Sequence, residues 1–421
     1  MKENITKTNN NLVIHTINTN KFKTNLIAAF LVVDLDKENI TKNALIPAVL
    51  RRGTANLTTM KEISNKMDNM YGAIFDASSD KIGDKQVIQF YISTIDDEYA
   101  LNNEKLLLES IDFVNDLIFN PKLINGTFDE EYVKGEKEQL RELIKGKIND
   151  KASFATYRCI EEMFKDEAYG VYKYGREEDL EKITSENLYE QYKKVLNEGE
   201  LHIYVVGKYD EEEIINYLKE KINFVSDNIE KKIEYKEKNI ENIEVKNIKD
   251  TQDVTQGKLV LGYDVLVNPS SEDYFKIMVY NAILGGSVNS KMFQNVREKE
   301  SLAYTARSLY IKHKGILLIT AGIEIEKHEK ALELIKIQVE DMKKGNFTEE
   351  DIKYAKIFLE NLFKTYTDDL STIVDLSFGN YLLNINYTVE EIIEKINNVN
   401  KNDIIEIASK MLLRVNYFLG N

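Results

Sequence analysis

Cysteine and long apolar runs are both scarce in this chain. Cys159 is the only cysteine among 421 residues, so no intramolecular disulfide can form, and such scarcity is typical of a reducing compartment. Leu26–Val33 is among the longest apolar stretches and falls far short of the ~20 residues that a membrane-spanning helix needs. The first residues, MKENITKTNNNLVIH, contain neither an apolar core nor a small-residue cleavage site. We therefore expect no secretory signal, no membrane partner and a cytoplasmic protein.

Long basic stretches are lacking as well. The 71 acidic residues outnumber the 56 basic ones, which gives a formal net charge of −15. Nucleic-acid-binding proteins displace counterions with a basic surface, and this sequence has no long run of lysine and arginine free of acidic residues. The charge argues against a nucleic-acid partner and favours a basic or polar peptide, although acidity also serves solubility alone.

Histidine is the third scarce residue. Only four are present, no two of them are spaced to share a metal-binding face, and we expect each to be a surface or strand-edge residue: His15, His202, His313 and His328. Cys159 lies in an amphipathic pattern, TYRCIEEMF, and is expected to be a buried thiol rather than a nucleophile. No G-x-S-x-G sequence is present, and Gly285-Gly286 lacks the following Lys-Ser/Thr pair of a phosphate-binding loop.

An internal duplication is the clearest feature that the sequence does contain. The length exceeds what one hydrophobic core usually serves, so two domains are expected. Gly126–Lys134 resembles Gly345–Lys353, 219 residues later, and a long helical pattern follows each segment. Asp129 and Thr348 stand where N-caps are expected, with acidic residues in the first turn of each helix.

A second pair of similar segments lies near the end of each half. Ile183–Leu188 and Val399–Ile404, offset by 216 residues, each lead into a helix and then a strand. The two strands end at Gly207 and Gly420, at an offset of 213. Between the halves, Ser226–Asp250 has dense mixed charge and is expected to be an exposed linker with room for one short strand.

Strand patterns alternate with amphipathic helices within each half. The strands are expected at Leu26–Val33, Gln86–Ser93, Lys258–Val265 and Gly315–Ile323, and helices at segments such as Lys105–Leu117 and Lys330–Met342. The predicted fold class is α+β, with two homologous domains that each contain a mainly antiparallel sheet and helices on one face. We place the N-terminal domain at 1–225, the charged linker at 226–250 and the C-terminal domain at 251–421.

The stretch Thr41–Thr54, TKNALIPAVLRRGT, resembles the zinc-binding segment of the pitrilysin/insulinase-type metallopeptidases. In that family an inverted H-x-x-E-H helix runs into a Gly-Thr turn, with two histidines as zinc ligands and a glutamate as general base. The resemblance places the histidines at Ala44 and Ala48 and the glutamate at Pro47, so all three are missing. Pro47 is expected to disturb the helix unless it lies in the first turn.

The helix expected around Glu136–Ile144 resembles the one that supplies the last zinc ligand of the family. That glutamate lies seven residues after the leading acid, which places it at Leu143. Glu142 is adjacent, but one residue corresponds to a turn of ~100° around a helix, so its carboxylate points elsewhere. We expect no metal and no cofactor in this chain, and no peptidase activity of its own.

The segments Leu284–Phe293 and Arg297–Tyr304, LGGSVNSKMF and REKESLAY, closely resemble the family's C-terminal motif, a Gly-rich turn opening a helix that ends in R-E-x-x-x-L-A-Y. In active members the residues matching Arg297 and Tyr304 reach the zinc site of the opposite half-assembly, hold the substrate backbone and stabilise the oxyanion. A guanidinium offers several planar donors, and a phenol is a neutral donor suited to an oxyanion. The alternative is that Arg297 pairs with Glu298 or Glu300 and that Tyr304 packs in the core.

The resemblance implies a catalytically inactive subunit that pairs with a zinc-binding homologue, as in the mitochondrial processing peptidase, where each chain is one half of a hollow clamshell. The pair is expected to process peptides or unfolded protein segments, with the zinc in the partner. The alternative is a non-proteolytic scaffold or binding protein of the same fold, including an assisting role in elongation factor P modification. A homodimer of the isolated chain stays open, and a self-sufficient hydrolase is the least favoured interpretation.

Overall fold

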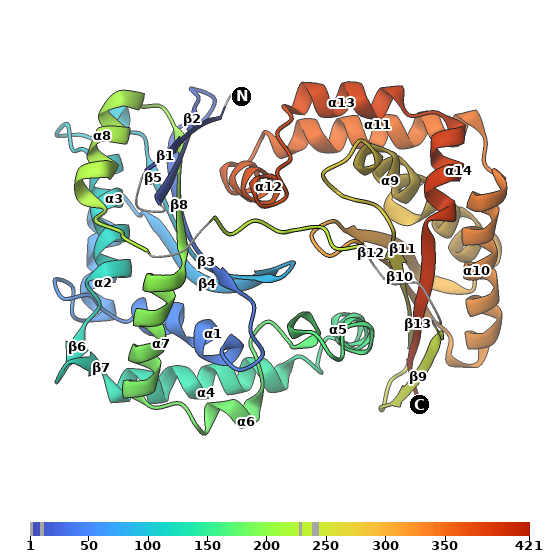
Figure 1. The fold of residues 1–421 in the computed structure, drawn as a ribbon, viewed down its shortest axis with the longest axis horizontal. Coiled ribbons are helices and arrows are strands. Elements are labelled where there is room, and N and C mark those ends of the chain that lie inside the picture. The colour runs from blue at the N-terminus through green and yellow to red at the C-terminus, as the bar shows by residue number, and fades with distance from the viewer. Residues whose placement is uncertain (1–2, 9–11, 227–229, 238–243) are drawn as a thin grey trace. The chain divides into compact units, whose positions relative to one another are not determined.

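The chain forms two compact units, each assembled from several stretches of sequence (Figure 1). The computed structural model describes residues 3–8, 12–226, 230–237 and 244–421. Unit 1 comprises Met1–Gly146, Val171–Lys232 and Leu370–Phe378, and unit 2 comprises Lys147–Gly170, Ile233–Asp369 and Gly379–Asn421.

Unit 1 is built on a six-stranded sheet in the order β1-β2-β8-β3-β5-β4. Its strands are β1 (Asn4–Lys7), β2 (Leu12–Asn18), β3 (Thr24–Asp34), β4 (Ile74–Ile82), β5 (Lys85–Ile95) and β8 (Glu200–Gly207). All neighbouring pairs are antiparallel except β2 and β8, which run parallel. A short hairpin, β6 (Leu123–Ile124) and β7 (Thr127–Phe128), stands apart from this sheet.

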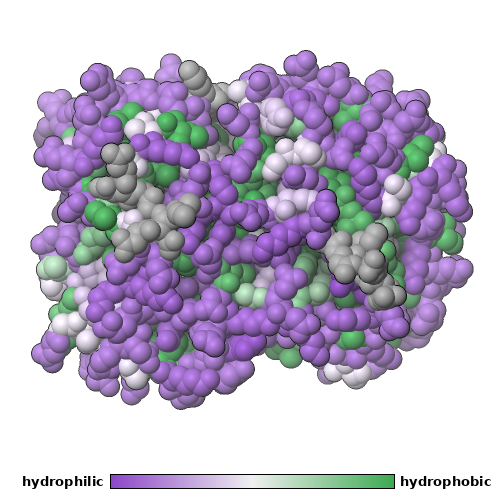
Figure 2. All heavy atoms as spheres, viewed as in Figure 1, coloured by the Kyte–Doolittle hydropathy of each residue, from purple (hydrophilic) through white to green (hydrophobic). Residues whose placement is uncertain are grey.

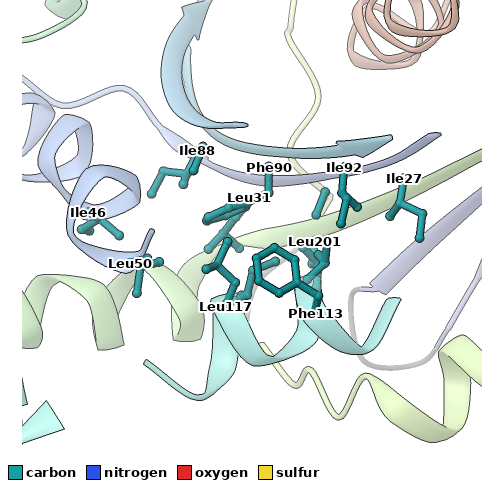
Figure 3. Packing of buried hydrophobic residues seen from close by; sticks show 14 of the residues in the cluster. Ile27, Leu31, Ile46, Leu50, Ile88, Phe90, Ile92, Phe113, Leu117 and Leu201 are labelled. Atoms are coloured by element: carbon teal, nitrogen blue, oxygen red, sulfur yellow. The ribbon is translucent and has the colours of Figure 1, made fainter. Parts of the chain in front are cut away.

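The core of unit 1 lies between one face of this sheet and its helices. These are α1 (Ile40–Leu50), α2 (Met60–Asn69), α3 (Leu106–Phe119), α4 (Glu130–Gly146), α6 (Glu177–Leu180), α7 (Ser185–Glu198) and α8 (Glu211–Lys221), with a 3-10 turn at Asp97–Tyr99. Ile27 and Leu31 of β3 join Phe113 and Leu117 of α3 and Leu50 of α1 in this core (Figure 3). The strand residues of this core recur at alternate positions, such as 27, 29, 31 and 33 of β3, because successive side chains point to opposite faces of a sheet.

Unit 2 repeats the strand arrangement of unit 1. Its five-stranded sheet has the order β11-β12-β10-β13-β9, formed by β9 (Lys246–Thr251), β10 (Gly257–Val265), β11 (Ala303–Ile311), β12 (Ile316–Ile323) and β13 (Met411–Gly420). Every pair is antiparallel except β13 and β9, which run parallel. Spatial order, chain order and direction match β4-β5-β3-β8-β2 of unit 1 strand for strand. The two units are therefore structural repeats.

The helices of unit 2 follow its strands in the same order as the helices of unit 1, apart from α5. They are α5 (Lys151–Met163), α9 (Asp273–Asn281), α10 (His328–Lys344), α11 (Glu349–Tyr366), α13 (Val389–Asn398) and α14 (Lys401–Ser409), with π-helical segments η3 (Ala282–Gly286) and η4 (Met292–Lys299) and 3-10 turns η2 (Ala168–Gly170) and η5 (Ile325–Lys327). Thr348 caps α11 in a capping box with Asp351, and Asp129 accepts a hydrogen bond from Glu131 N at 3.0 Å at the start of α4. The expected caps are confirmed.

Each sheet carries one further helix on its second face. In unit 1 this is the Leu370–Phe378 part of α12 (Leu370–Leu382), where Phe378 stacks on Phe30 of β3 with ring centroids 4.2 Å apart. In unit 2 it is α5, whose Met163 and Cys159 approach β10 so closely that a side chain at Gly262 would collide with both sulfurs. The two helices are equivalent in the repeat, since α5 follows α4 and α12 follows α11. Each half of the chain thus contributes one helix to the other half's unit.

The α+β class is confirmed, as are the strands and helices expected from the apolar patterns. The division into domains at 225 and 251 stays a prediction, and packing assigns 147–170 and 370–378 to the opposite units. The segment expected to be an exposed linker is exposed only in part. Lys231 is buried, with Nζ 2.8 Å from Asp34 Oδ2 and its backbone N 2.8 Å from Glu200 Oε2. Strand β9 lies in this segment, while 227–229 and 238–243 lie outside the described residues.

Hydrophilic side chains cover most of the face of the molecule shown in Figure 2. Among the helices in the described ranges, none is both long enough and apolar enough to cross a bilayer.

Candidate functional site

Helix α1 holds the positions at which the family resemblance places the two zinc-binding histidines. Leu45 and Leu50 anchor the helix in the core of unit 1. Ala44 is buried and Ala48 is partly exposed, so methyl groups occupy both histidine positions. A methyl group offers no lone pair to a metal ion.

Pro47 lies inside α1, yet the helix continues to Leu50. The expectation that this proline would disturb the helix outside its first turn was wrong. Proline removes one backbone hydrogen bond from a helix interior. Here only one further turn follows, and Arg51 N still donates to Pro47 O at 3.2 Å. Burial of Val49 and Leu50 beyond the proline offsets the lost bond.

The buried polar groups of α1 are engaged in holding the helix in place. Asn43 Nδ2 donates to Gln86 Oε1 on β5, and Gln191 Nε2 of α7 donates to Asn43 Oδ1, both at 2.9 Å. Gln86 Nε2 in turn donates to Ile40 O at 2.9 Å. This amide network satisfies buried donors and acceptors, which would otherwise be costly, and fixes α1 against its sheet.

Helix α4 holds the third ligand position. Leu143 occupies it and is 53% exposed. Glu136, two turns earlier, is only 2% exposed, and its carboxylate pairs with the guanidinium of Arg52 directly after α1. This buried carboxylate, on the same helix as the third ligand position, is thus already neutralised by a cation of the same unit.

These residues do not fit a zinc ion. Ala44, Ala48 and Leu143 carry no nitrogen, oxygen or sulfur donor, whereas zinc requires three or four. Within the described ranges, no group of three His, Cys, Asp or Glu side chains is placed to hold a metal ion. Unit 1 therefore has the two helices that carry the ligand positions, but the side chains at these positions have no donor atoms.

The C-terminal motif of unit 2 forms two π-helical segments, η3 and η4. Such segments are rare and are frequently found at functional sites. Arg297 lies on the last turn of η4. Gly285 on η3 faces β11, where an added side chain would lie 2.5 Å from Ser308 N. Gly285 therefore permits the close approach of η3 to β11, in line with the absence of phosphate-loop residues.

Two irregularities direct Tyr304 away from the core. Ser301 has a φ of 51°, in the left-handed region that non-glycine residues rarely adopt. The register then shifts: Ala303 lies opposite Ile323 and Thr305 opposite Gly322, so Tyr304 is the extra residue of a β-bulge. Bulges re-aim side chains and are common beside active sites. Tyr304 is accordingly 60% exposed.

Arg297 and Tyr304 line one pocket of about 420 Å³ on unit 2. Glu298, Ser301, Ala303 and Glu324 complete its lining. The guanidinium and the phenol can donate hydrogen bonds to carbonyl oxygens, while the two carboxylates can accept them from amide groups or cationic side chains. The chemistry of the pocket suits a peptide backbone.

The sequence left open whether Arg297 and Tyr304 serve only the chain's own packing. Tyr304 is not in the core, so that half of the alternative is wrong. Arg297 does contact Glu298, at 3.4 Å between Nε and Oε1, and its guanidinium lies over the ring of Phe293, 4.6 Å from the centroid. Glu300 pairs with Lys330 instead, at 3.3 Å.

Sequence reasoning missed Ser301 and Glu324 as neighbours of this pair. Glu324 follows β12 and reaches the pocket only because β12 pairs with β11. No local spacing signals such a contact. Ser301 gives no signal either, because its left-handed conformation is one that residue type does not predict.

The expectation that every histidine is a surface or strand-edge residue was wrong for His15 and His202. Both are fully buried, and His15 Nε2 lies 3.0 Å from His202 Nδ1. They meet because β2 and β8 are adjacent and parallel, although 187 residues separate them in the chain. His313 lies in the turn after β11 and His328 begins α10.

Cys159 is fully buried on α5, as expected. Burial raises the pKa of its thiol to about 12. Since the thiolate is the nucleophile, Cys159 is chemically inert in the folded protein.

The fold and both motif regions have relatives among known proteins. Residues 182–359 match the family described as "Peptidase M16 inactive domain". The "Probable inactive metalloprotease YmfF" of Bacillus subtilis is 32% identical over 417 residues, which cover 97% of this chain and 95% of that protein. The "Uncharacterized zinc protease YmxG" of the same organism is 25% identical over 324 residues, covering 75% and 76%. A solved structure of a conserved protein from Enterococcus faecalis V583 has a TM-score of 0.91 at 27% identity, covering 100% of this chain and 98% of that one.

These similarities define a metallopeptidase-type α+β protein of two repeated units. The chain belongs to the peptidase M16 family. The resemblance to pitrilysin/insulinase-type metallopeptidases is thereby confirmed, and the chain is a member in which the H-x-x-E-H motif is absent.

Proposed function

We propose that the chain is a catalytically inactive subunit that pairs with a zinc-binding M16 homologue and supplies Arg297 and Tyr304 to the partner's active site. The heterodimer processes peptides or unfolded protein segments in the cytoplasm. Zinc and the general base belong to the partner, and this chain contributes hydrogen-bond donors for the substrate backbone and for the oxyanion.

One observation carries this proposal. Arg297 and Tyr304 line a common pocket, and a β-bulge turns Tyr304 outward, in a chain whose zinc positions have no ligand atoms. Packing alone does not account for an exposed phenol beside a guanidinium, because neither side chain contributes its full apolar area to the core. The described residues of this chain form no group that could hold zinc for the pair to serve, so a second chain is the natural recipient.

The alternative is a non-proteolytic scaffold or binding protein, including an assisting role in elongation factor P modification. A scaffold needs no oxyanion donor, so it leaves the position of Tyr304 unexplained. The name of the B. subtilis relative, a probable inactive metalloprotease, agrees with a chain that is inactive on its own in either case.

The test is co-purification of the tagged full chain from its native source, followed by mass spectrometry and peptide hydrolysis assays. We expect an M16 homologue with an intact H-x-x-E-H in a near-equal amount. The chain alone should hydrolyse no peptide, and the reconstituted pair should. The homologue alone is the control. A principal partner without the zinc motif, or a pair no more active than the homologue alone, supports the scaffold instead.

A further inference from the structure

A chain of four titratable side chains crosses the interior of unit 1 and has no part in the proposed function. Glu3 precedes β1, His15 lies on β2, and His202 and Glu200 lie on β8. His15 Nδ1 is 2.7 Å from Glu3 Oε1, His15 Nε2 is 3.0 Å from His202 Nδ1, and His202 Nε2 is 3.2 Å from Glu200 Oε2. We refer to these four residues as the histidine chain.

The histidine chain holds segments that are far apart in the sequence. Ser377 Oγ of α12 donates to Glu3 Oε2 at 2.7 Å, and Lys231 N donates to Glu200 Oε2 at 2.8 Å. The ring of His15 stacks on Tyr204 with centroids 4.0 Å apart, and His202 meets Phe378 at 5.3 Å. The segment before β1, the sheet and α12 therefore all meet at the two imidazoles.

The geometry is that of proton sharing and not of metal binding. Among the described residues, no third His, Cys, Asp or Glu joins the two facing ring nitrogens as a potential ligand, since Glu3 and Glu200 contact the opposite nitrogens of each ring. A stable site for a transition metal needs at least three protein donors.

The number of protons decides whether the histidine chain holds together. Glu3 is an acceptor, so His15 Nδ1 carries a proton, and His15 Nε2 then accepts from His202 Nδ1–H. One further proton fits on His202 Nε2, facing Glu200. The next proton can bind only to His15 Nε2, between the two rings. It would place two N–H donors 3.0 Å apart in a buried site. The hydrogen bond between the two rings is then lost, and two positively charged rings face each other in a buried site.

We propose that the histidine chain is an acid-sensitive latch that fastens the Glu3 segment, strand β1 and the Ser377 turn of α12 to the first sheet near neutral pH and releases them on acidification. Among the described residues, the charged groups around the histidine chain are Glu230 and Lys232 from the segment after α8, and Lys7 from β1, which pairs with Glu230 at 2.8 Å. The carboxylates of Glu3 and Glu200 belong to the histidine chain itself. From α12, Ser377 and Phe378 add no charge.

The direction of the pH effect follows from the histidines. Burial lowers the pKa of His15 to about 4 and also lowers the pKa of His202. When the latch is open, both rings take up protons at their ordinary, higher pKa. The open form therefore binds more protons than the closed form at any pH between the folded-state pKa and the ordinary pKa. The latch is therefore fully closed above the ordinary histidine pKa and weakens as the pH falls toward the folded-state value.

Hydrogen exchange of the full-length protein tests the latch. After correction for the intrinsic pH dependence of exchange, we expect amides in 3–8, 12–18 and 370–378 to exchange at least about tenfold faster at about pH 4.5 than at about pH 7. Amides of β10 and β12 in unit 2 are the internal reference. In His15→Gln and His202→Gln, where an amide can donate and accept but cannot titrate, the midpoint of this transition should shift down by about one pH unit or vanish. His328 does not belong to the histidine chain, so the variant His328→Gln should behave like the parent protein.

If both glutamine variants fail to fold, histidine NMR of the parent protein decides. The latch requires His15 and His202 to gain protons over the same pH range in which exchange accelerates. Acceleration while both rings stay neutral, or glutamine variants with an unchanged midpoint, would overturn the proposal.

Discussion

Polar residues near the degenerate metal site hold the surrounding helices and strands together. Glu136 and Arg52 connect α4 to the end of α1, and the polar side chain of Asn43 is held between β5 and α7. A leucine and two alanines stand where the family places its ligands. None of these three side chains has a donor atom, so the absence of a ligand extends to all three positions.

The first prediction concerns metal content. The purified chain should bind no stoichiometric zinc, because Ala44, Ala48 and Leu143 have no donor atoms. Elemental analysis after dialysis measures this, with the zinc-binding homologue analysed in parallel as the positive control. One tightly held zinc per chain would contradict the assignment of these positions.

The second prediction concerns the pair formed by Arg52 and Glu136. Arg52→Ala leaves the nearly inaccessible Glu136 carboxylate without its cation, so the free energy of unfolding should fall by about 2–4 kcal/mol, somewhat reduced by the partial exposure of Arg52. Urea unfolding measures it. Lys193→Ala breaks an exposed pair with Glu190 and should cost less than about 0.5 kcal/mol. Equal losses in the free energy of unfolding would show that the buried pair stabilises the fold no more than the exposed pair does.

At the scale of secondary-structure elements, the exchanged helices α5 and α12 are the main departure from a simple tandem repeat. Both have an apolar face, and the sequence shows that this face must be buried. It does not show which sheet receives it, because amphipathic spacing identifies a buried face and not its partner. The same limit explains the histidines, whose meeting depends on the pairing of β2 with β8.

A third prediction tests the docking of α12 on the first sheet. Phe378 is 1% exposed and contacts Phe30, Tyr204 and His202. Phe378→Ala should lower the free energy of unfolding by about 3–5 kcal/mol, since it removes a buried aromatic ring and leaves a cavity. Tyr354→Ala, on the exposed side of α11, should change it by less than about 0.5 kcal/mol in denaturant titrations. A cost below about 1 kcal/mol for Phe378→Ala would mean that α12 is not firmly docked.

Much of the element order was predictable because the signals are local. Capping residues, the repeat at an offset of 219 residues and the periodicity of apolar residues identify α4, α11, β3 and β10 directly. The orientation of Tyr304 was not predictable. It depends on a bulge and on the left-handed Ser301, which are fixed by the packing of η4 and β11 and not by any residue preference.

At the scale of the whole molecule, the division into two halves leads to a fourth prediction. Limited proteolysis should cut first at 234–237 or 244–245, because these residues are mostly exposed, while Lys231 and Ile233 are buried and β9 is paired in the sheet. Gels should show two fragments of roughly equal size. Since 147–170 and 370–378 each pack in the other half's unit, the fragments should co-elute in native size-exclusion chromatography and separate in denaturant. Early cleavage inside Glu136–Lys145 would contradict the proposed boundary.

The central claim is that this chain completes a partner's active site, and the hydroxyl of Tyr304 tests it most directly. Tyr304→Phe keeps the ring, so folding and association with the zinc-binding homologue should persist. If the hydroxyl donates to the oxyanion, kcat of the reconstituted pair should fall roughly 10–1000-fold. Arg297→Lys keeps the charge but loses the planar fork, and should also impair turnover.

The matched control is Tyr310→Phe on the same strand. Its hydroxyl is buried, so its removal should leave kcat and KM nearly unchanged. The deciding measurement is therefore the kcat of the Tyr304→Phe pair beside those of the parent and Tyr310→Phe pairs, with complex formation verified for each. We predict a loss confined to Tyr304→Phe. An intact complex with parental kcat and KM would contradict the account and leave the scaffold as the function of this chain.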